Sequence, residues 1–334
     1  MNKNTCLALF SGGLDSLLAV KVMQNLGINV IPANFSTGFF FNTYKIENGN
    51  LIYKEKLPDD IKVKVIDISN DFFKIIKSPK YGFGKNLNPC IDCKILMLRK
   101  AKELMGVFNA GYVITGEVIG QRPMTQNIKS MEIIERESGL QGFLLRPLCA
   151  KHLPETEPEK MGWVNRNKLL DFKGRSRKPQ LQLAKELGLS DFVKSPAGGC
   201  ILTDINYSKR LKDFMDNKSE LTKEDIFLLS VGRHFRKDKI KFIIGRNFQD
   251  NQILLQFKDR DDIFIFECKD VPSPVGFTKD KLTFDDKIFI ASAVARYSDG
   301  KLSEKVKVAI YNKSNEQEIE VKPINEEILK EYRI

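Results

Sequence analysis

The chain has 334 residues, enough for about two domains, and its composition (42% hydrophobic, 29% charged) excludes an intrinsically disordered protein. No segment approaches the roughly 20 uninterrupted apolar residues that cross a bilayer, and the first apolar stretch is too short for a secretory signal, so we expect a cytoplasmic protein without a membrane partner. Lys and Arg number 54 against 43 Asp and Glu, a net charge of +11 that suits a polyanionic partner such as nucleic acid.

Strand-like and helical segments alternate along the first part of the chain. The apolar runs that predict buried strands are 5–10, 28–35, 63–69 and 112–117, and helical periodicity follows at 17–27, after Cys90 and at 177–189. Because parallel strands need helical crossovers, this alternation predicts an α/β fold with a doubly wound parallel sheet. We place this first domain at 1–202.

Two other regions depart from the alternation. Residues 36–60 are rich in aromatic and β-branched side chains around Asn48-Gly49, which predicts an inserted hairpin, and the sequence assigns it no function. Beyond about residue 200, the helical stretches 207–217 and 222–231 precede short strand-like runs at 239–245, 262–267 and 305–312. This part, 203–334, is predicted to be a second, smaller, basic α+β domain with a possible role in RNA binding.

The string Ser11-Gly12-Gly13-Leu14-Asp15-Ser16 lies at the first strand–helix junction. Glycines let the backbone approach a ligand and adopt positive φ, and loop amides with a helix N-terminus form an anion site. Asp15 is placed to hold Mg²⁺ on pyrophosphate, and the two serines offer hydroxyls to phosphate oxygens. An ordinary tight turn is the alternative, but the whole string at this junction favours a phosphate loop.

This string resembles the signature of the PP-loop ATP pyrophosphatases, and it lacks the Gly-Lys-Ser/Thr ending of a Walker loop. The resemblance implies that ATP is cleaved between its α and β phosphates and that a substrate oxygen is adenylated. It also implies that the end of the second strand, at Asn34 and Phe35, lines the adenine pocket.

Three cysteines form the next constellation. Cys90 and Cys93 follow Pro89 at the start of a predicted helix, whose dipole should lower their pKa, and Cys200 follows two glycines at the end of the first domain. Three interpretations remain open: a [4Fe–4S] cluster on all three thiols, a metal-free persulfide and disulfide pair, or zinc with Cys149 and His152. Zinc leaves Cys200 without a role, and inert buried thiols are the plain alternative.

The Asn-Pro-Cys-x-x-Cys pattern and the later cysteine resemble the tRNA 2-thiouridylases of the PP-loop class, over about residues 1–200. In that family the cysteines matching Cys93 and Cys200 handle sulfur, and a cysteine at the position of Cys90 is typical of the cluster-binding members. Residues 115–121 are similar to the Gly-Glu-x-x-Gly-Gln stretch of 4-thiouridine synthetases. The expected catalytic residues are Asp15, Cys90, Cys93 and Cys200, and the expected nucleotide-site residues are Phe10, Ser11, Gly12, Gly13, Leu14, Asp15, Ser16, Asn34, Phe35, Gly116, Glu117 and Gln121.

Basic residues occur in both predicted domains. Residues 231–256 resemble the RNA-binding domain of the ribosome-associated NFACT proteins, and such groups position phosphates and stack on bases. The expected RNA-binding residues are Arg122, Arg146, Arg175, Arg177 and Lys178 in the first domain, and Arg233, Arg236 and Arg246 in the second. A solvated basic face is the alternative, and we interpret His234 as a packing or phosphate-binding group.

We therefore predict a tRNA sulfurtransferase that uses ATP and Mg²⁺ to adenylate a uridine carbonyl oxygen and replaces that oxygen by sulfur from the three-cysteine site. Its expected partners are tRNA and a sulfur donor, which is a cysteine desulfurase, a carrier protein or free sulfide. Two alternatives stay open: a PP-loop ligase that forms an amide or nitrile on a small molecule, and a non-catalytic RNA-binding or ribosome-associated factor.

Overall fold

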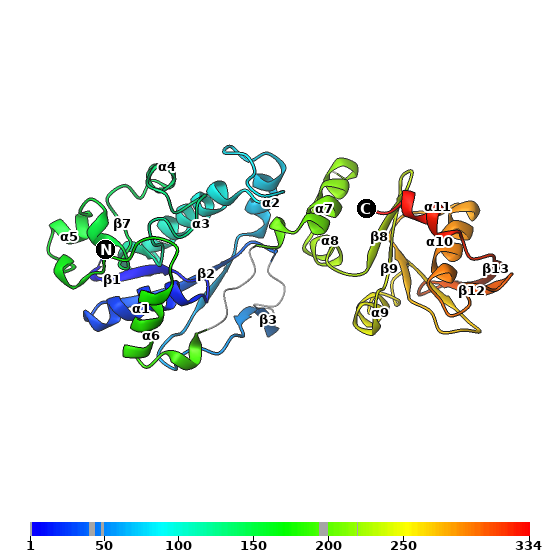
Figure 1. The fold of residues 1–334 in the computed structure, drawn as a ribbon, viewed down its shortest axis with the longest axis horizontal. Helices are drawn as coiled ribbons and strands as arrows, with labels where there is room; N and C mark the ends of the chain where they lie inside the picture. Colours follow the sequence, from blue (N-terminus) through cyan, green and yellow to red (C-terminus); the bar gives the residue numbers. More distant parts are fainter. Residues whose placement is uncertain (1, 40–43, 48–49, 194–199, 219) are drawn as a thin grey trace. The chain divides into compact units, whose positions relative to one another are not determined.

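The computed structural model describes residues 2–39, 44–47, 50–193, 200–218 and 220–334. The chain divides into two compact units, unit 1 (Met1–Asp204) and unit 2 (Ile205–Ile334). The boundary predicted from the sequence lies two residues before this division. Figure 1 shows the elements of each unit.

Unit 1 is built on a five-stranded sheet whose strands pair in parallel. The strand order is β5-β2-β1-β6-β7. The strands are β1 (Asn2–Leu9), β2 (Asn29–Ser36), β5 (Lys64–Asp67), β6 (Ala110–Thr115) and β7 (Leu144–Leu145). The apolar runs of β1 and β6 are buried along most or all of their length, as expected for central strands of a sheet covered on both faces.

Helices cover both faces of this sheet, so the predicted doubly wound α/β fold is confirmed. The helices are α1 (Leu14–Asn25), α2 (Ser69–Lys77), α3 (Cys90–Met105), α4 (Ile128–Ser138), α5 (Glu157–Lys160) and α6 (Lys178–Glu186). In Figure 1, α1 and α6 lie on one face of the sheet, and α2, α3 and α4 lie on the other. The chain runs outward from β1 to β2 and β5, then returns to β6 and β7. Strand order thus reverses between β1 and β6, which is where such sheets bind ligands, beyond the carboxyl ends of the strands.

The insertion at 36–60 holds a second, two-stranded sheet. Strand β3 (Tyr44–Glu47) pairs antiparallel with β4 (Asn50–Tyr53), where the sequence predicts a hairpin. The Asn48-Gly49 turn on which that prediction was based lies outside the described residues.

Unit 2 contains a six-stranded antiparallel sheet with the order β13-β12-β10-β11-β9-β8. Its strands are β8 (Arg233–Lys237), β9 (Ile240–Ile244), β10 (Phe264–Cys268), β11 (Gly276–Thr278), β12 (Val306–Tyr311) and β13 (Glu316–Val321). The predicted second domain of α+β type is therefore confirmed.

Side chains alternate between two apolar cores along the strands of unit 2. Phe242 and Phe266 pack with Val294 of α10, whereas their neighbours Ile243 and Ile265 join the other core. The helices are α7 (Ile205–Asn217), α8 (Lys223–Leu228), α9 (Phe248–Leu255), α10 (Phe284–Arg296) and α11 (Glu326–Glu331). Within the described residues of both units, none of the helices has the length and apolar character needed to cross a bilayer.

Candidate active site

The SGGLDS loop connects the end of β1 to the first turn of α1. Gly12 has φ +77°, so the glycine with positive φ expected from the sequence is confirmed, and Gly13 is the N-cap of α1. The Ser16 hydroxyl donates to the Gly13 carbonyl oxygen at 2.8 Å, and the Ser11 and Ser16 hydroxyls lie 3.3 Å apart. The two serines that were expected to reach phosphate oxygens thus hold the loop in shape.

Asp15 lies in the first turn of α1 and is largely buried. One carboxylate oxygen, Oδ2, accepts a hydrogen bond from Gln121 Nε2 at 2.9 Å. The other, Oδ1, is buried and has no hydrogen-bond partner among the described residues. Burial raises the pKa of Asp15 above its ordinary value, while Gln121, Arg177 and Arg122 oppose that rise. A buried carboxylate oxygen without a donor at an anion-binding loop is a suitable ligand for a cation such as Mg²⁺.

Gly116, at the carboxyl end of β6, packs directly on the start of α1. A Cβ at this position would lie 2.3 Å from the Asp15 carbonyl oxygen and 2.6 Å from the Ser16 backbone nitrogen. Only glycine allows this close approach of two backbones. The sequence suggested Gly116 as a nucleotide-site residue, and the structure shows a direct packing role at the switch point between β1 and β6.

The residues expected at the adenine pocket lie at the ends of β1 and β2. Asn34 Nδ2 donates to the Phe10 carbonyl oxygen at 2.7 Å, and this bond links the two strand ends. The side chains of Phe10, Asn34 and Phe35 are all buried. Their role toward adenine stays a prediction.

Glu117 belongs to a buried ionic network beneath the loop, together with Arg146, Lys94 and Glu135. Glu117 accepts from Arg146 at 3.3 Å and from the Thr115 hydroxyl at 3.0 Å, and Lys94 lies 3.6 Å away. Arg146 also pairs with Glu135 at 2.9 Å. Burial alone would raise the pKa of Glu117, but Lys94 and Arg146 bring it below its ordinary value.

This network corrects one prediction. The side chain of Arg146 is only 3% exposed and its guanidinium is occupied by two carboxylates, so the expectation that it binds RNA is wrong in this structure. The sequence carried no signal of its burial, because an arginine after an apolar run is usually a surface residue.

Cys90 and Cys93 open α3, one helical turn apart, as the sequence predicts. The Cys90 thiol donates to the Asn88 side-chain oxygen at 3.1 Å. Asn86 Nδ2 donates to the Thr203 carbonyl oxygen at 2.7 Å, which attaches the segment before α3 to the segment after Cys200. The residues from 194 to 199, including the two glycines before Cys200, lie outside the described part of the chain.

The three thiols lie close enough to influence one another. Burial raises the pKa of Cys93 to about 12, and the next contribution to that rise comes from Cys200. Burial likewise raises the pKa of Cys200 to about 11, with a further contribution from Cys90. Cys93 and Cys200 are 107 residues apart in the sequence (200 − 93), yet they influence each other within unit 1.

These pKa directions correct a second expectation. The helix N-terminus was expected to favour thiolates, but burial dominates and raises the pKa of Cys90 as well, so the thiols are protonated at neutral pH. A metal bound there would have to displace these protons.

No set of three histidine, cysteine or acidic side chains among the described residues is placed to hold a single metal ion. Two residues of the zinc alternative have other partners: the Cys149 thiol donates to the Glu117 carbonyl oxygen at 3.2 Å, and His152 Nε2 bonds to the Asp171 carbonyl oxygen at 2.7 Å. The structure therefore gives the zinc interpretation no support. A cubane cluster is larger than one ion, so its thiolates are spaced more widely than the ligands of a zinc ion.

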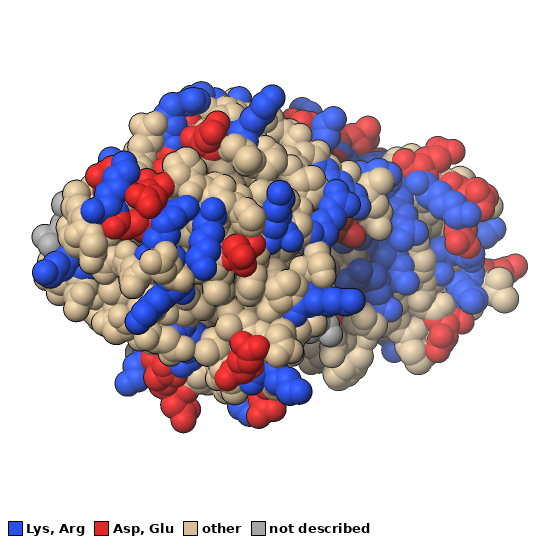
Figure 2. Space-filling view, turned by 60° about the vertical axis from the view of Figure 1, so that its left-hand side comes forward, with Lys and Arg blue, Asp and Glu red and all other residues tan. Residues whose placement is uncertain are grey.

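Arg122 connects the loop to the thiols. It counteracts the raised pKa of both Asp15 and Cys90, so its guanidinium lies near both groups. Arg122, Arg175 and Lys178 are exposed and Arg177 is half-buried. Figure 2 shows basic side chains over much of the visible face, with fewer acidic ones between them. Asp15 at the start of α1 and Cys90 at the start of α3 are thus both under the influence of Arg122.

The predicted RNA-binding arginines of unit 2 already have intramolecular partners. Arg236 makes two hydrogen bonds to Asp213, at 2.5 and 2.9 Å, and Arg246 pairs with Asp250 at 2.7 Å. The Arg233 guanidinium lies over the Tyr297 ring, 4.7 Å from its centre. Arg246 keeps 42% of its side chain exposed and Arg236 only 16%, so Arg246 is the more accessible of the two.

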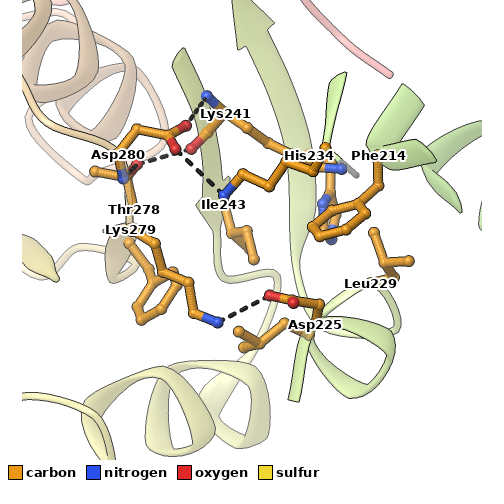
Figure 3. A pocket seen from close by; sticks show the side chains of 12 residues that line it. Phe214, Asp225, Leu229, His234, Lys241, Ile243, Thr278, Lys279 and Asp280 are labelled. Atoms are coloured by element: carbon orange, nitrogen blue, oxygen red, sulfur yellow. Dashed lines mark hydrogen bonds and ion pairs between the residues drawn. The ribbon is translucent and has the colours of Figure 1, made fainter. Parts of the chain in front are cut away.

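His234 lies in the wall of a pocket in unit 2. Its empty volume is about 380 Å³, part of it open to solvent, and Figure 3 shows His234, Lys241 and Phe214 at its wall. His234 Nε2 donates to the Val231 carbonyl oxygen at 2.8 Å, and burial lowers its pKa well below the ordinary value. His234 is therefore a neutral packing residue. Burial also lowers the pKa of Lys241 to about 8, and its ammonium pairs with Asp213 at 3.0 Å.

The fold and the site define an α/β domain with a phosphate loop at its first strand–helix junction and three thiols beside it. Residues 1–154 match the family model described as "Thiamine biosynthesis protein (ThiI)". Residues 232–333 match the model of the "NFACT protein RNA binding domain". Both resemblances that were predicted from the motifs are thus confirmed, each for its own part of the chain.

Two relatives are named "Probable tRNA sulfurtransferase". The protein from Thermococcus kodakarensis is 28% identical over 144 residues, which cover 42% of this chain and 36% of that protein. The protein from Methanosarcina mazei is 32% identical over 125 residues, covering 34% of this chain and 28% of that protein. The chain thus spans about a third of the length of these relatives.

Among solved structures, a 4-thiouridine synthetase in complex with RNA and ATP aligns with a TM-score of 0.39 and 16% identity. The alignment covers 68% of this chain and 51% of that one.

Proposed function

We propose that this protein is an ATP-dependent tRNA sulfurtransferase that acts in the cytoplasm. The observation that carries the proposal is the presence in one unit of the SGGLDS loop, with an Asp15 oxygen that has no hydrogen-bond partner among the described residues, and of three cysteines, of which Cys200 influences Cys93. The match of residues 1–154 to the ThiI family and the names of the two relatives support it.

ATP binds with its phosphates on residues 11–16, and Asp15 would hold Mg²⁺ through Oδ1, which has no hydrogen-bond partner among the described residues. A uridine carbonyl oxygen attacks the α-phosphorus, a new oxygen–phosphorus bond forms, and the bond to pyrophosphate breaks. Loop amides and Arg122 stabilise the charge that develops on the departing pyrophosphate. The uridine oxygen, now bonded to AMP, is a good leaving group.

Sulfur then replaces that oxygen. A sulfur nucleophile adds to the activated carbon, and AMP departs with the oxygen. Cys90, Cys93 and Cys200 would hold a [4Fe–4S] cluster, which supplies an open iron site for sulfide when it is bound. A persulfide on Cys93 or Cys200, with the other thiol resolving it, is the metal-free version of this delivery. For the persulfide route the sulfur comes from a cysteine desulfurase or a carrier protein, which transfer sulfur already at the persulfide oxidation level, and the disulfide left by the resolving thiol is reduced by an external thiol before the next turnover. Free sulfide can serve only the cluster, because it would need an oxidant to form a persulfide.

tRNA is bound by the exposed basic side chains near the loop and by unit 2. Arg122, Arg175, Arg177 and Lys178 are accessible for phosphate contacts. The match of residues 232–333 to an RNA-binding domain supports an RNA contact by unit 2. Because that match covers most of unit 2, it also favours a second candidate function, a non-catalytic RNA-binding factor.

Asp15→Asn separates the two candidates. In a mixture of the purified protein, ATP, Mg²⁺ and unmodified tRNA without a sulfur source, the wild type is expected to release pyrophosphate as AMP is transferred to the tRNA, and the variant is expected to be at least about a hundredfold slower, because the metal ligand is lost.

Asp71→Asn, which alters an exposed carboxylate on α2, is the control and is expected to act like the wild type. Equal rates for wild type and Asp15→Asn would contradict the catalytic proposal. RNA binding without any ATP cleavage by the wild type would favour the second candidate.

A further inference from the structure

The insertion between β2 and β5 covers the phosphate loop. A Cβ on Gly12 would lie 1.7 Å from the Tyr53 hydroxyl oxygen and 2.7 Å from Glu55 Oε2. These two atoms therefore rest directly against the loop backbone, on the side of Gly12 that has no side chain. No role for this insertion could be assigned from the sequence, although it interrupts the nucleotide-binding fold immediately after β2.

The contact is held by interactions on both sides of the loop. The Tyr53 hydroxyl donates to Glu55 Oε2 at 2.6 Å, and the Tyr53 ring meets the Phe10 ring edge-on, with centres 6.1 Å apart. Tyr53 is partly buried against the core of unit 1. Further along, Asp60 pairs with Lys21 of α1 at 2.5 Å. The insertion thus contacts both Phe10, which precedes the loop, and α1, which follows it.

A phosphate group cannot share this position with the pair. The loop presents its amides and the N-terminus of α1 to an anion, and glycine at position 12 leaves room for that anion to approach. The phenol oxygen now fills this room, and the neighbouring Glu55 carboxylate, if ionised, repels a phosphate. The Tyr53–Glu55 pair therefore competes with the nucleotide for the surface of Gly12.

We propose that Tyr53 and Glu55 set the nucleotide affinity of this enzyme, by closing the phosphate loop as a gate that ATP must displace. The inference rests on the proposed ATP site. When a binding-competent state is only a fraction of the population, the apparent affinity falls by that fraction. Removing the Tyr53 hydroxyl or the Glu55 charge takes away a group that stands against Gly12, and so favours the open state and strengthens ATP binding.

Calorimetric titration of the full-length protein with a non-hydrolysable ATP analogue and Mg²⁺ tests the gate. Tyr53→Phe keeps the ring against Phe10 and removes only the hydroxyl, and Glu55→Gln removes the charge. Each variant is expected to bind the analogue about tenfold more tightly than the wild type: Tyr53→Phe removes the oxygen that stands against Gly12, and Glu55→Gln removes the negative charge that repels the phosphate.

Tyr311→Phe is the matched control. The Tyr311 hydroxyl also donates to a glutamate, Glu267, but this pair lies in unit 2. Its analogue affinity is expected to equal that of the wild type. Unchanged or weaker binding by both Tyr53→Phe and Glu55→Gln, with normal binding by the wild type, overturns the gate and leaves the ATP site standing. If neither the wild type nor any variant binds the analogue, the proposed ATP site itself is wrong, and the gate with it.

Hydrogen exchange gives a second readout. Backbone amides of residues 50–60 are expected to exchange faster when the analogue is bound, because the segment leaves the loop. Slower exchange in that segment would mean that it closes over the nucleotide, and displacement would be wrong.

Discussion

Cys200→Ser is expected to reduce tRNA thiolation by more than about a hundredfold while ATP binding stays within twofold or so of the wild type. The reason is that Cys200 lies beside Cys93 and Cys90, whereas the phosphate loop is held by its own serines and by Gly116. Serine keeps the size of the side chain but neither binds iron as a thiolate does nor carries a persulfide. The measurement is mass spectrometry of thionucleosides after incubation with tRNA, ATP, Mg²⁺ and a thiol reductant, once with sulfide and once with a cysteine desulfurase and cysteine as the sulfur source.

Cys268→Ser is the control, because Cys268 is a half-buried free cysteine of unit 2. It is expected to thiolate tRNA at the wild-type rate. If Cys200→Ser is as active as Cys268→Ser, sulfur delivery through the cysteines of unit 1 is contradicted. Iron analysis of the anaerobically purified proteins separates the two chemistries: a cluster predicts iron that Cys200→Ser loses, and the persulfide mechanism predicts no iron in either protein.

Gly116→Ala is expected to lower the free energy of unfolding of unit 1 by about 1–3 kcal/mol and to weaken ATP binding. The added Cβ would meet backbone atoms of Asp15 and Ser16 at 2.3 to 2.6 Å, and backbone cannot move aside as a flexible side chain can. The start of α1, and with it the Asp15 carboxylate, has to shift. Urea unfolding and calorimetric titration with ATP measure the two effects.

Gly106→Ala is the matched glycine control. Gly106 has helical φ and ψ of −63° and −43°, and no atom lies within 4 Å of an added Cβ. Alanine there is expected to leave stability unchanged or to raise it slightly. Equal stability and affinity for the two variants would show that the close contact between β6 and α1 is unimportant.

The fold of unit 1 was predictable because its strands and helices have strong local signals. The apolar runs at 5–10, 28–35 and 112–117 form largely buried strands, whereas the run at 63–69 forms the edge strand β5, which is not buried as predicted. The positive φ of Gly12 follows from the SGGLDS string itself. Strand β7, with only two residues, and helix α4 were missed, because β7 is too short for a periodic pattern and α4 carries a mixed pattern of polar and apolar residues.

Unit 2 was harder to predict because its strands contain charged residues. Strand β8 (RHFRK) looks like a basic motif, yet Phe235 is fully buried, and Arg236 and Lys237 pair with Asp213 and Asp286. The cations of such a strand are partnered by residues that are distant in sequence, such as Asp213. The sequence around β8 does not reveal those partners.

Within the candidate site, the chemical groups themselves were easier to predict than their burial and their neighbours. The sequence placed Asp15 and the three cysteines as the chemical groups, but it did not reveal the burial that raises the pKa of the thiols. It also missed Lys94 beside Glu117, Gln180 beside Gln121 and Tyr53 above Gly12. Each of these contacts joins segments that come together only in the folded chain.

The central claim, that this protein places sulfur in tRNA, is tested most directly by mass spectrometry of the nucleosides of total tRNA from cells that lack its gene. The account predicts that one thiolated uridine disappears in these cells and returns when the wild-type gene is restored. A full set of thiolated nucleosides in the cells without the gene would contradict the claim.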